Sequence, residues 1–146
     1  MEQTLTVVCL LAAGLYAGGS VFISLVSHPA RLSGDDVFAL EHIRREHDYV
    51  DKVLPIFLLI AGCLSCALWY WGERAVAVPL YSGVVLLLVV PYSIAIVGPT
   101  LTRLLDRDAK YERGEVRKLI SRWGKLHGLR AIAGTVALWL WLTVLL

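Results

Sequence analysis

Two sets of residues, each with a histidine that can move a proton, recur at the spacing of an α-helix. One set shares a single helix face and comprises Trp123, His127, Arg130 and Gly134. The other forms a polar stripe on a second helix and comprises Tyr16, Ser20, Ser24 and His28. An imidazole is suited to proton transfer near neutral pH, and a guanidinium can stabilise an oxyanion. The residue types therefore predict a base at His127 or His28 and an anion clamp at Arg130 or Arg31.

Structural roles are the alternative for the same residues. Arginines near the ends of apolar helices extend to lipid headgroups, which would account for Arg31, Arg103 and Arg130, while the histidines would cap helix ends. A third interpretation is a haem or iron site, because two histidines from different helices can ligate a haem iron, and His28 and His127 are the candidates. Otherwise we predict no metal site and no firm cofactor, since the chain lacks the Glu-x-x-His pairs of carboxylate-bridged metal centres.

Four apolar runs must position these residues. They cover approximately 4–26, 53–71, 75–97 and 126–146, the last with a polar beginning. A bilayer core of ~30 Å needs about 20 helical residues, and in lipid an open strand edge would leave backbone groups unpaired. The sequence therefore predicts an all-α fold, a four-helix transmembrane bundle, which forms one integral membrane domain over residues 1–146.

The basic residues are segregated along the chain. Thirteen of the fourteen Lys and Arg residues lie within 27–52 and 98–130. Because an excess of Lys and Arg marks the cytoplasmic side, we expect loops one and three to be cytoplasmic and both termini to lie outside a plasma or inner membrane. Basic residues beside the spans indicate contact with membrane lipid rather than nucleic acid. The chain begins without a basic region, so no cleavable signal peptide is expected.

Short amphipathic helices at the membrane surface are expected in loops one and three. Val37–Lys52 has an apolar side and opposite charges four residues apart on the other side. Residues 102–125 are predicted to form two helical pieces broken at Gly114. The first span is expected to end at His28 and Pro29, because a residue before proline is pushed out of the helical conformation. Residues 72–74 are expected to form a tight turn, and no repeat relates the two halves of the sequence.

Small residues and cysteines in the spans have structural interpretations. Gly14 and Gly18 form a small-xxx-small motif, which is expected to pack inside the bundle of one chain, with a homo-oligomer as the alternative. Cys63 and Cys66 form a C-x-x-C pair. A membrane thiol oxidase would need a second cysteine pair on a loop, and no loop contains one. We therefore expect these cysteines to be ordinary small apolar residues.

The predicted topology brings the polar residues of three spans to one depth. The set near the cytoplasmic interface comprises His28, Arg31, Pro99, Arg103, Trp123, His127 and Arg130. Ionisable groups within spans are costly and usually face the interior of a bundle or a cavity. The sequence therefore predicts a pocket at this depth for a lipophilic small molecule.

Four segments carry a resemblance to a known family. They are Val26-Ser-His-Pro-Ala-Arg31, Pro91-Tyr-Ser93, Gly98-Pro-Thr100 and Trp123-Gly-Lys-Leu-His-Gly-Leu-Arg130. In this order they resemble the small four-span membrane proteins related to fungal anthrone oxygenase. The family pattern has an asparagine two residues after the proline that matches Pro99, where this chain has Leu101.

This resemblance implies oxidation of a lipophilic aromatic or quinone-type substrate, such as an anthrone, by O2 without an evident cofactor. His127 or His28 would remove a proton, and the resulting carbanion would reduce O2, while Arg130 stabilises the phenolate or enolate. The predicted substrate-binding residues are Trp123 and Tyr92, which would stack on the substrate, with Arg31, Pro99 and Thr100. The alternative is a non-catalytic membrane protein that binds a lipid or quinone or serves as a small subunit of a complex.

Overall fold

The structure, a computed structural model, describes residues 2–72 and 77–145. Within these ranges the chain is almost entirely helical and contains no strand. Its elements are α1 (Glu2–Phe22), η1 (Ile23–Ser27), α2 (His28–Leu32), α3 (Asp36–Trp71), α4 (Val78–Tyr92), η2 (Ser93–Val97), α5 (Gly98–Leu105) and α6 (Glu115–Leu145). The tight turn expected at 72–74 lies largely outside the described residues.

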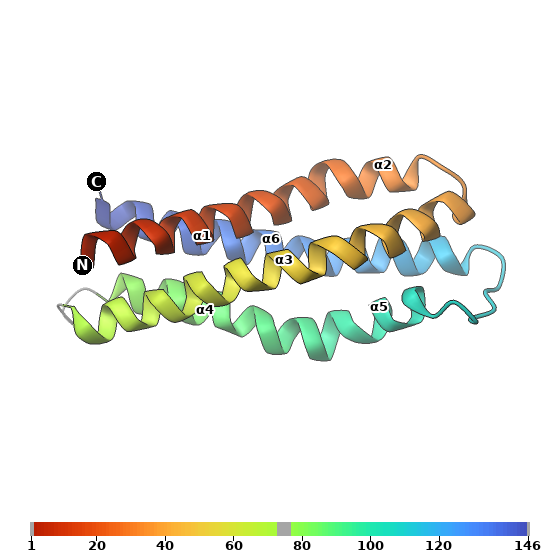
Figure 1. The fold of residues 1–146 in the computed structure, drawn as a ribbon. Helices are drawn as coiled ribbons and strands as arrows, with labels where there is room; N and C mark the ends of the chain where they lie inside the picture. Colours follow the sequence, from red (N-terminus) through yellow and green to blue (C-terminus); the bar gives the residue numbers. More distant parts are fainter. Residues whose placement is uncertain (1, 73–76, 146) are drawn as a thin grey trace.

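The elements form an antiparallel bundle of four long helices (Figure 1). Each long helix packs on two neighbours, in the order α1, α3, α4 and α6 around the bundle. The four helical stretches Glu2–Leu32, Asp36–Trp71, Val78–Leu105 and Glu115–Val144 are long and apolar enough to cross a membrane. The predicted fold class is confirmed, and the chain is a multi-pass membrane protein.

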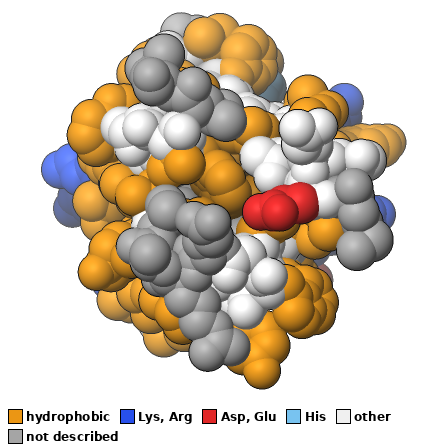
Figure 2. Space-filling model, turned by 90° about the vertical axis from the view of Figure 1, so that its left-hand side faces the viewer, with side chains coloured by type: hydrophobic (Ala, Val, Ile, Leu, Met, Phe, Trp, Pro, Cys, Tyr) orange, Lys and Arg blue, Asp and Glu red, His pale blue; other side chains and the backbone are white. Residues whose placement is uncertain are grey.

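The two ends of the bundle differ in charge. Both termini lie at one end, and the connections rich in Lys and Arg lie at the other (Figure 1). Figure 2 shows the end with the termini, where hydrophobic side chains dominate and blue Lys and Arg side chains are confined to the rim. A membrane protein gathers charge where its helices leave the hydrocarbon, so the charged connections mark one membrane surface.

Two π-helical turns, η1 and η2, each stand directly before an X-Pro pair. The N–H of His28 donates to Ile23 O and that of Gly98 donates to Ser93 O, in each case five residues back. The wider turn accommodates proline, which has no N–H and would otherwise clash with the preceding turn. The prediction that the first helix ends at His28 was therefore wrong, since helical structure continues to Leu32. The two halves of the fold share a π turn before an X-Pro pair, although their sequences show no repeat.

The amphipathic segment Val37–Lys52 is helical, as predicted, but it is not a separate helix. It forms the first part of α3, which runs unbroken for 36 residues through Pro55. The Asp35 side chain caps this helix by accepting from Phe38 N at 2.8 Å. Because the inward residues keep helical spacing from Ala39 to Leu68, nothing in the segment favours a break between the surface part and the span.

The third connection contains the predicted break at Gly114. This glycine has φ of +76°, a conformation that L side chains rarely adopt, and α6 begins directly after it. The segment after the break is the first part of α6 rather than a separate surface helix. The predicted helical piece before the break was wrong, because α5 ends at Leu105 and residues 106–113 are not helical. Tyr111 anchors the intervening loop by donating from its hydroxyl to Arg103 O at 2.7 Å.

The glycines that mediate helix packing are not the expected pair. A Cβ atom at Gly14 or Gly18 would meet no atom within 4 Å, so the prediction that this pair packs inside the bundle was wrong. Close approach occurs instead at Gly19, against Leu54 of α3, and at Gly134, where a Cβ would lie 3.0 Å from the ring of Tyr16. The polar stripe that includes Tyr16 therefore faces α6, and the pair Gly14 and Gly18 faces outward.

Candidate functional site

Arg31 lies fully buried at the charged end of the bundle, in α2. Its guanidinium forms an ion pair with Glu46 of α3, and Ser27 of η1 donates to the same carboxylate. The guanidinium also lies 4.8 Å from the ring centroid of Trp123, a cation–π contact with α6. Arg31 is thus held inside the bundle by three helices and does not extend to the headgroups.

Sequence reasoning did not select Glu46 as a site residue. The side chain is 17% exposed and has oxygens engaged by Arg31 and Ser27. Its position could have been found, because Ala39, Ile43, Glu46 and Val50 recur at steps of four, three and four on the inward side of α3. A carboxylate in such an apolar row predicts a buried cation beside it, because an unpaired buried charge is costly, and Arg31 is that cation.

Trp123 is the centre around which the two candidate histidines gather. The ring centroid of His28 lies 6.0 Å from that of Trp123, and the ring centroid of His127 lies 4.9 Å from it. His28 reaches this position because residue 124 is a glycine, and a Cβ there would collide with the imidazole. The structure therefore brings His28, Arg31, Trp123 and His127 together from α2 and α6.

The hydrogen bonds of Ser24 define the tautomer of His127, which is only 2% exposed. The Ser24 hydroxyl donates to Ser20 O at 2.9 Å and lies 3.1 Å from Nδ1 of His127. A hydroxyl has one proton and a carbonyl can only accept, so Ser24 accepts from Nδ1–H of His127. The neutral ring therefore keeps the lone pair of Nε2 for a proton or another electrophile.

Several buried polar atoms, three of which belong to this cluster, have no hydrogen-bond partner among the described residues. They are Tyr16 OH, Ser20 Oγ, His28 Nδ1, Arg31 Nη1, Trp123 Nε1 and Arg130 Nε. Most buried polar groups in proteins are satisfied, and an unsatisfied one calls for a specific explanation. The nitrogens of both arginines and of the tryptophan can only donate, so this region is rich in donors that can receive an oxygen atom.

A cavity of about 10 Å³ lies beside His127 and has room for about one water molecule. It is lined by Ile23, Ile43, Glu46, His47, Val50, Asp51, Leu101, Trp123 and His127. Leu101, the position at which the resemblance implies an asparagine, is part of this lining. His47, which pairs with Asp51 at 2.5 Å, was not selected from the sequence, because helical projection alone does not show what a face of α3 meets.

The remaining predicted site residues occupy different environments. Arg130 is 7% exposed and is therefore buried, one turn after His127 on α6. Thr100 is buried, whereas Pro99 is exposed on the surface of the bundle. The Tyr92 hydroxyl donates to Leu126 O at 3.0 Å and so ties α4 to α6.

The cysteines and the other potential ligands do not gather. Cys9, Cys63 and Cys66 are free thiols, and Cys63 is exposed rather than buried. Among the described residues, no group of three or more His, Cys, Asp or Glu side chains is arranged to hold a metal ion. His28 and His127, the candidate haem ligands, both lie against the ring of Trp123.

The fold and the cluster define a four-helix, multi-pass membrane protein with a buried, donor-rich site at its charged end. The model of the anthrone oxygenase family matches residues 47–140, and the chain belongs to this family. The matched region contains Leu101, Trp123, His127 and Arg130, while the segment with His28 and Arg31 precedes it. No curated protein and no solved structure matches the chain.

Proposed function

We propose that this protein oxidises a lipophilic aromatic substrate of the anthrone type with O2, at the cluster around His127. The observation that carries the proposal is the buried His127, whose Nδ1–H is committed to Ser24 so that Nε2 is left as a base. Membership of the anthrone oxygenase family supports the reaction type. A membrane location suits the substrate, because such molecules partition into lipid.

The chemistry begins with proton removal from the methylene carbon of the anthrone by Nε2 of His127. The negative charge of the resulting carbanion is delocalised onto the carbonyl oxygen of the anthrone. The carbanion transfers electrons to O2, which forms a C–O bond and a peroxide. Loss of the second C–H proton with cleavage of the O–O bond gives the carbonyl of the quinone. Overall, CH2 and O2 become C=O and H2O, and the protons that the base removes are returned to the departing oxygen. General base catalysis of this kind contributes about 10²–10⁴-fold to a rate.

The neighbours of His127 supply binding and charge stabilisation. Arg130 Nε and Arg31 Nη1 are buried donors without partners among residues 2–72 and 77–145, suited to the oxygen on which negative charge develops. The ring of Trp123 offers a flat surface for stacking. Because the cavity beside His127 holds only about one water molecule, a tricyclic substrate enters by separating the helices around it. The π turns η1 and η2, at the same end of the bundle, are the points where the helices can adjust.

The test measures O2 uptake and anthraquinone absorbance with the purified full chain in nanodiscs and anthrone as substrate. His127→Ala is expected to lower turnover at least about 100-fold, because the base is lost. Trp139→Phe, at an exposed position of α6, is the matched control and is expected to keep the wild-type rate. Equal rates for wild type and His127→Ala would contradict the proposal. Saturable binding without turnover in the wild type would favour a protein that binds a quinone or lipid.

The membrane orientation is part of the same proposal. We place both termini outside and the connections rich in Lys and Arg in the cytoplasm of a plasma or inner membrane, because thirteen of fourteen cations lie in those two segments. A single cysteine introduced at the loop residue Asp108, in a chain without its native cysteines, should react with a membrane-impermeant maleimide only after the membrane is opened. Labelling of intact cells would contradict this orientation.

A further inference from the structure

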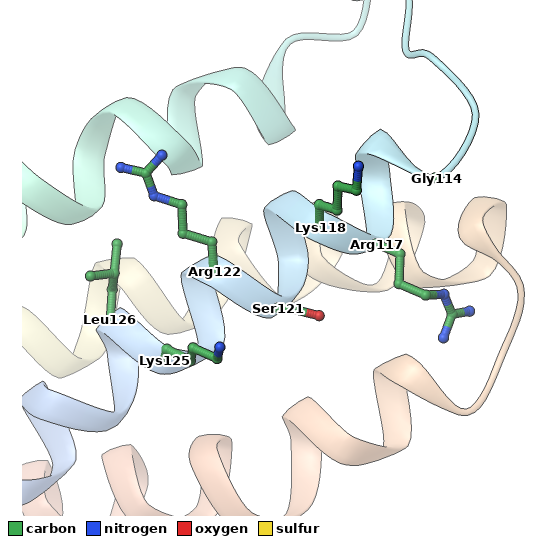
Figure 3. Close-up of a pocket in the computed structure, with 7 residues that line it drawn as sticks. All are labelled: Gly114, Arg117, Lys118, Ser121, Arg122, Lys125 and Leu126. Carbon is green, nitrogen blue, oxygen red and sulfur yellow. The ribbon is translucent and has the colours of Figure 1, made fainter.

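A basic groove lies on the first turns of α6, away from the His127 cluster. It has a volume of about 620 Å³, and its polar lining consists of Arg117, Lys118, Ser121, Arg122 and Lys125 (Figure 3). Every charged side chain in this lining is a cation. The groove therefore presents a positive surface at the charged end of the bundle, where α6 enters the membrane.

Three of the four cations are available for a ligand. Arg117 is engaged, because it pairs with Asp36 at 3.2 Å and donates to Leu32 O and Gly34 O, which fixes this side of the groove to the connection between α2 and α3. The side chains of the other three, Lys118, Arg122 and Lys125, have no ion pair or hydrogen bond with any described residue. A cluster of free cations at a membrane surface attracts anionic headgroups.

A second groove continues along α6 toward the middle of the membrane. It has a volume of about 410 Å³, carries no charged side chain and runs between α1 and α6. Its α6 side is formed by Gly128, Ile132 and Thr135, which share one helix face with Ser121 and Lys125 at steps of four and three. At Gly128 a Cβ would meet no atom within 4 Å, so the absence of a side chain there keeps the groove open.

The length of this face matches one leaflet. From Lys125 to Thr135 the helix rises ~15 Å, since each residue adds about 1.5 Å. A hydrocarbon core of ~30 Å gives each leaflet about the same length. The cationic groove and the apolar groove are thus joined on one face of the protein, and the distance from Lys125 to Thr135 matches one leaflet.

We propose that this face binds one anionic phospholipid of the cytoplasmic-side leaflet. The phosphate lies among Lys118, Arg122 and Lys125, and one acyl chain follows Gly128, Ile132 and Thr135 between α1 and α6. A soluble polyanion would use only the cations, whereas a lipid also uses the apolar groove. The lipid site shares Ser24 with the proposed oxidase site, but it uses neither the lone pair of His127 nor Trp123.

The experiment measures binding of phosphatidylglycerol and of phosphatidylcholine with the same chains to the detergent-purified full chain, by native mass spectrometry. Phosphatidylglycerol is expected to bind at least about tenfold more tightly. Replacing the three free cations by Gln should remove this preference, by about fivefold per cation. The matched control replaces Arg107, Lys110 and Arg113, which carry the same charge outside the groove, and should keep the preference.

A second variant tests the acyl path. Gly128→Leu fills the apolar groove and should weaken both lipids about equally without changing the preference for phosphatidylglycerol. Equal binding of the two lipids by wild type, or an equal loss in the control triple variant, would overturn the headgroup site. If Gly128→Leu left the affinity unchanged and a soluble oligonucleotide displaced the lipid, the ligand of this site would be a soluble polyanion. That result would overturn the proposal.

Discussion

The two ends of the bundle differ in how completely their buried polar groups are paired. At the end with the termini, Cys9 lies 3.1 Å from Ser65, Trp141 donates to Ser65 at 2.9 Å, and Ser82 donates to Ala137 O at 3.0 Å. At the charged end, the nitrogens of Trp123 and Arg130 and one nitrogen of Arg31 are buried without a partner among the described residues. Polar groups join helices at both ends, as Tyr92 and Glu46 do at the charged end, but these unpaired nitrogens belong to the charged end.

Two tryptophans of α6 make the contrast most clearly. Trp141 is 3% exposed and Trp123 is 6% exposed, so both indoles are removed from solvent to the same degree. The indole N–H of Trp141 donates to Ser65, whereas that of Trp123 has no acceptor among the described residues. An unpaired buried donor costs stability, so the two indoles differ in how much they contribute to the folded state.

The largest expected effect comes from breaking the ion pair at the charged end. Glu46→Gln leaves Arg31 buried without a counter-ion, and loss of one partner of such a pair costs about 3–5 kcal/mol of unfolding free energy. The check is thermal or denaturant unfolding in a fixed detergent. The matched control is Glu41→Gln in the exposed pairs with Arg44 and Arg45, where the change should stay within about 1 kcal/mol. Equal losses of unfolding free energy in the two variants would show that the buried pair of Arg31 and Glu46 stabilises the fold no more than the pairs of Glu41.

The second effect compares the two tryptophans directly. Trp123→Phe and Trp141→Phe remove the same atoms, but only the second removes a hydrogen bond. Trp141→Phe should therefore lower the unfolding free energy by about 1 kcal/mol more than Trp123→Phe. Oxygen uptake should show the reverse order, with the larger loss in Trp123→Phe. A greater destabilisation by Trp123→Phe would mean that its indole has a structural partner.

The smallest effect on stability is expected at two glycines of α6. Gly128→Ala should raise the unfolding free energy by up to about 1 kcal/mol, because alanine favours the helix and open space surrounds the position. Gly124→Ala should gain less, because its Cβ displaces the His28 imidazole, and it should lower oxygen uptake. The measurement is the unfolding free energy of the two variants in the same detergent, each compared with wild type. An identical gain at both positions would show that His28 moves away without cost.

The sequence was sufficient for the fold and for most of the cluster. Length and apolarity predicted four spans, and helical spacing placed His127 and Arg130 on one face. The course of the helix beyond His28 could not be predicted, because a π turn depends on hydrogen bonds that residue spacing does not reveal. The rule that a residue before proline leaves the helix failed at His28, because the π turn before it accommodates Pro29.

The partners across the bundle were the part that the sequence left open. Glu46 shares no motif with Arg31, and their pairing arises only when α2 meets α3. The role of Gly124 likewise depends on where His28 lies in the neighbouring helix. The outward position of Gly14 and Gly18 follows from the rotation of α1, which the polar stripe beginning at Tyr16 sets by facing α6.

We propose that the charged end of the bundle receives its ligand at Trp123. The most direct measurement follows the indole N–H resonances of ¹⁵N-tryptophan protein in nanodiscs during titration with a hydroxyanthraquinone, with assignments from Trp123→Phe and Trp141→Phe. The account predicts that the Trp123 resonance moves as its N–H gains an acceptor, while that of Trp141, already bonded to Ser65, stays in place. A shift of Trp141 alone, or no shift of Trp123 at saturation, would contradict it.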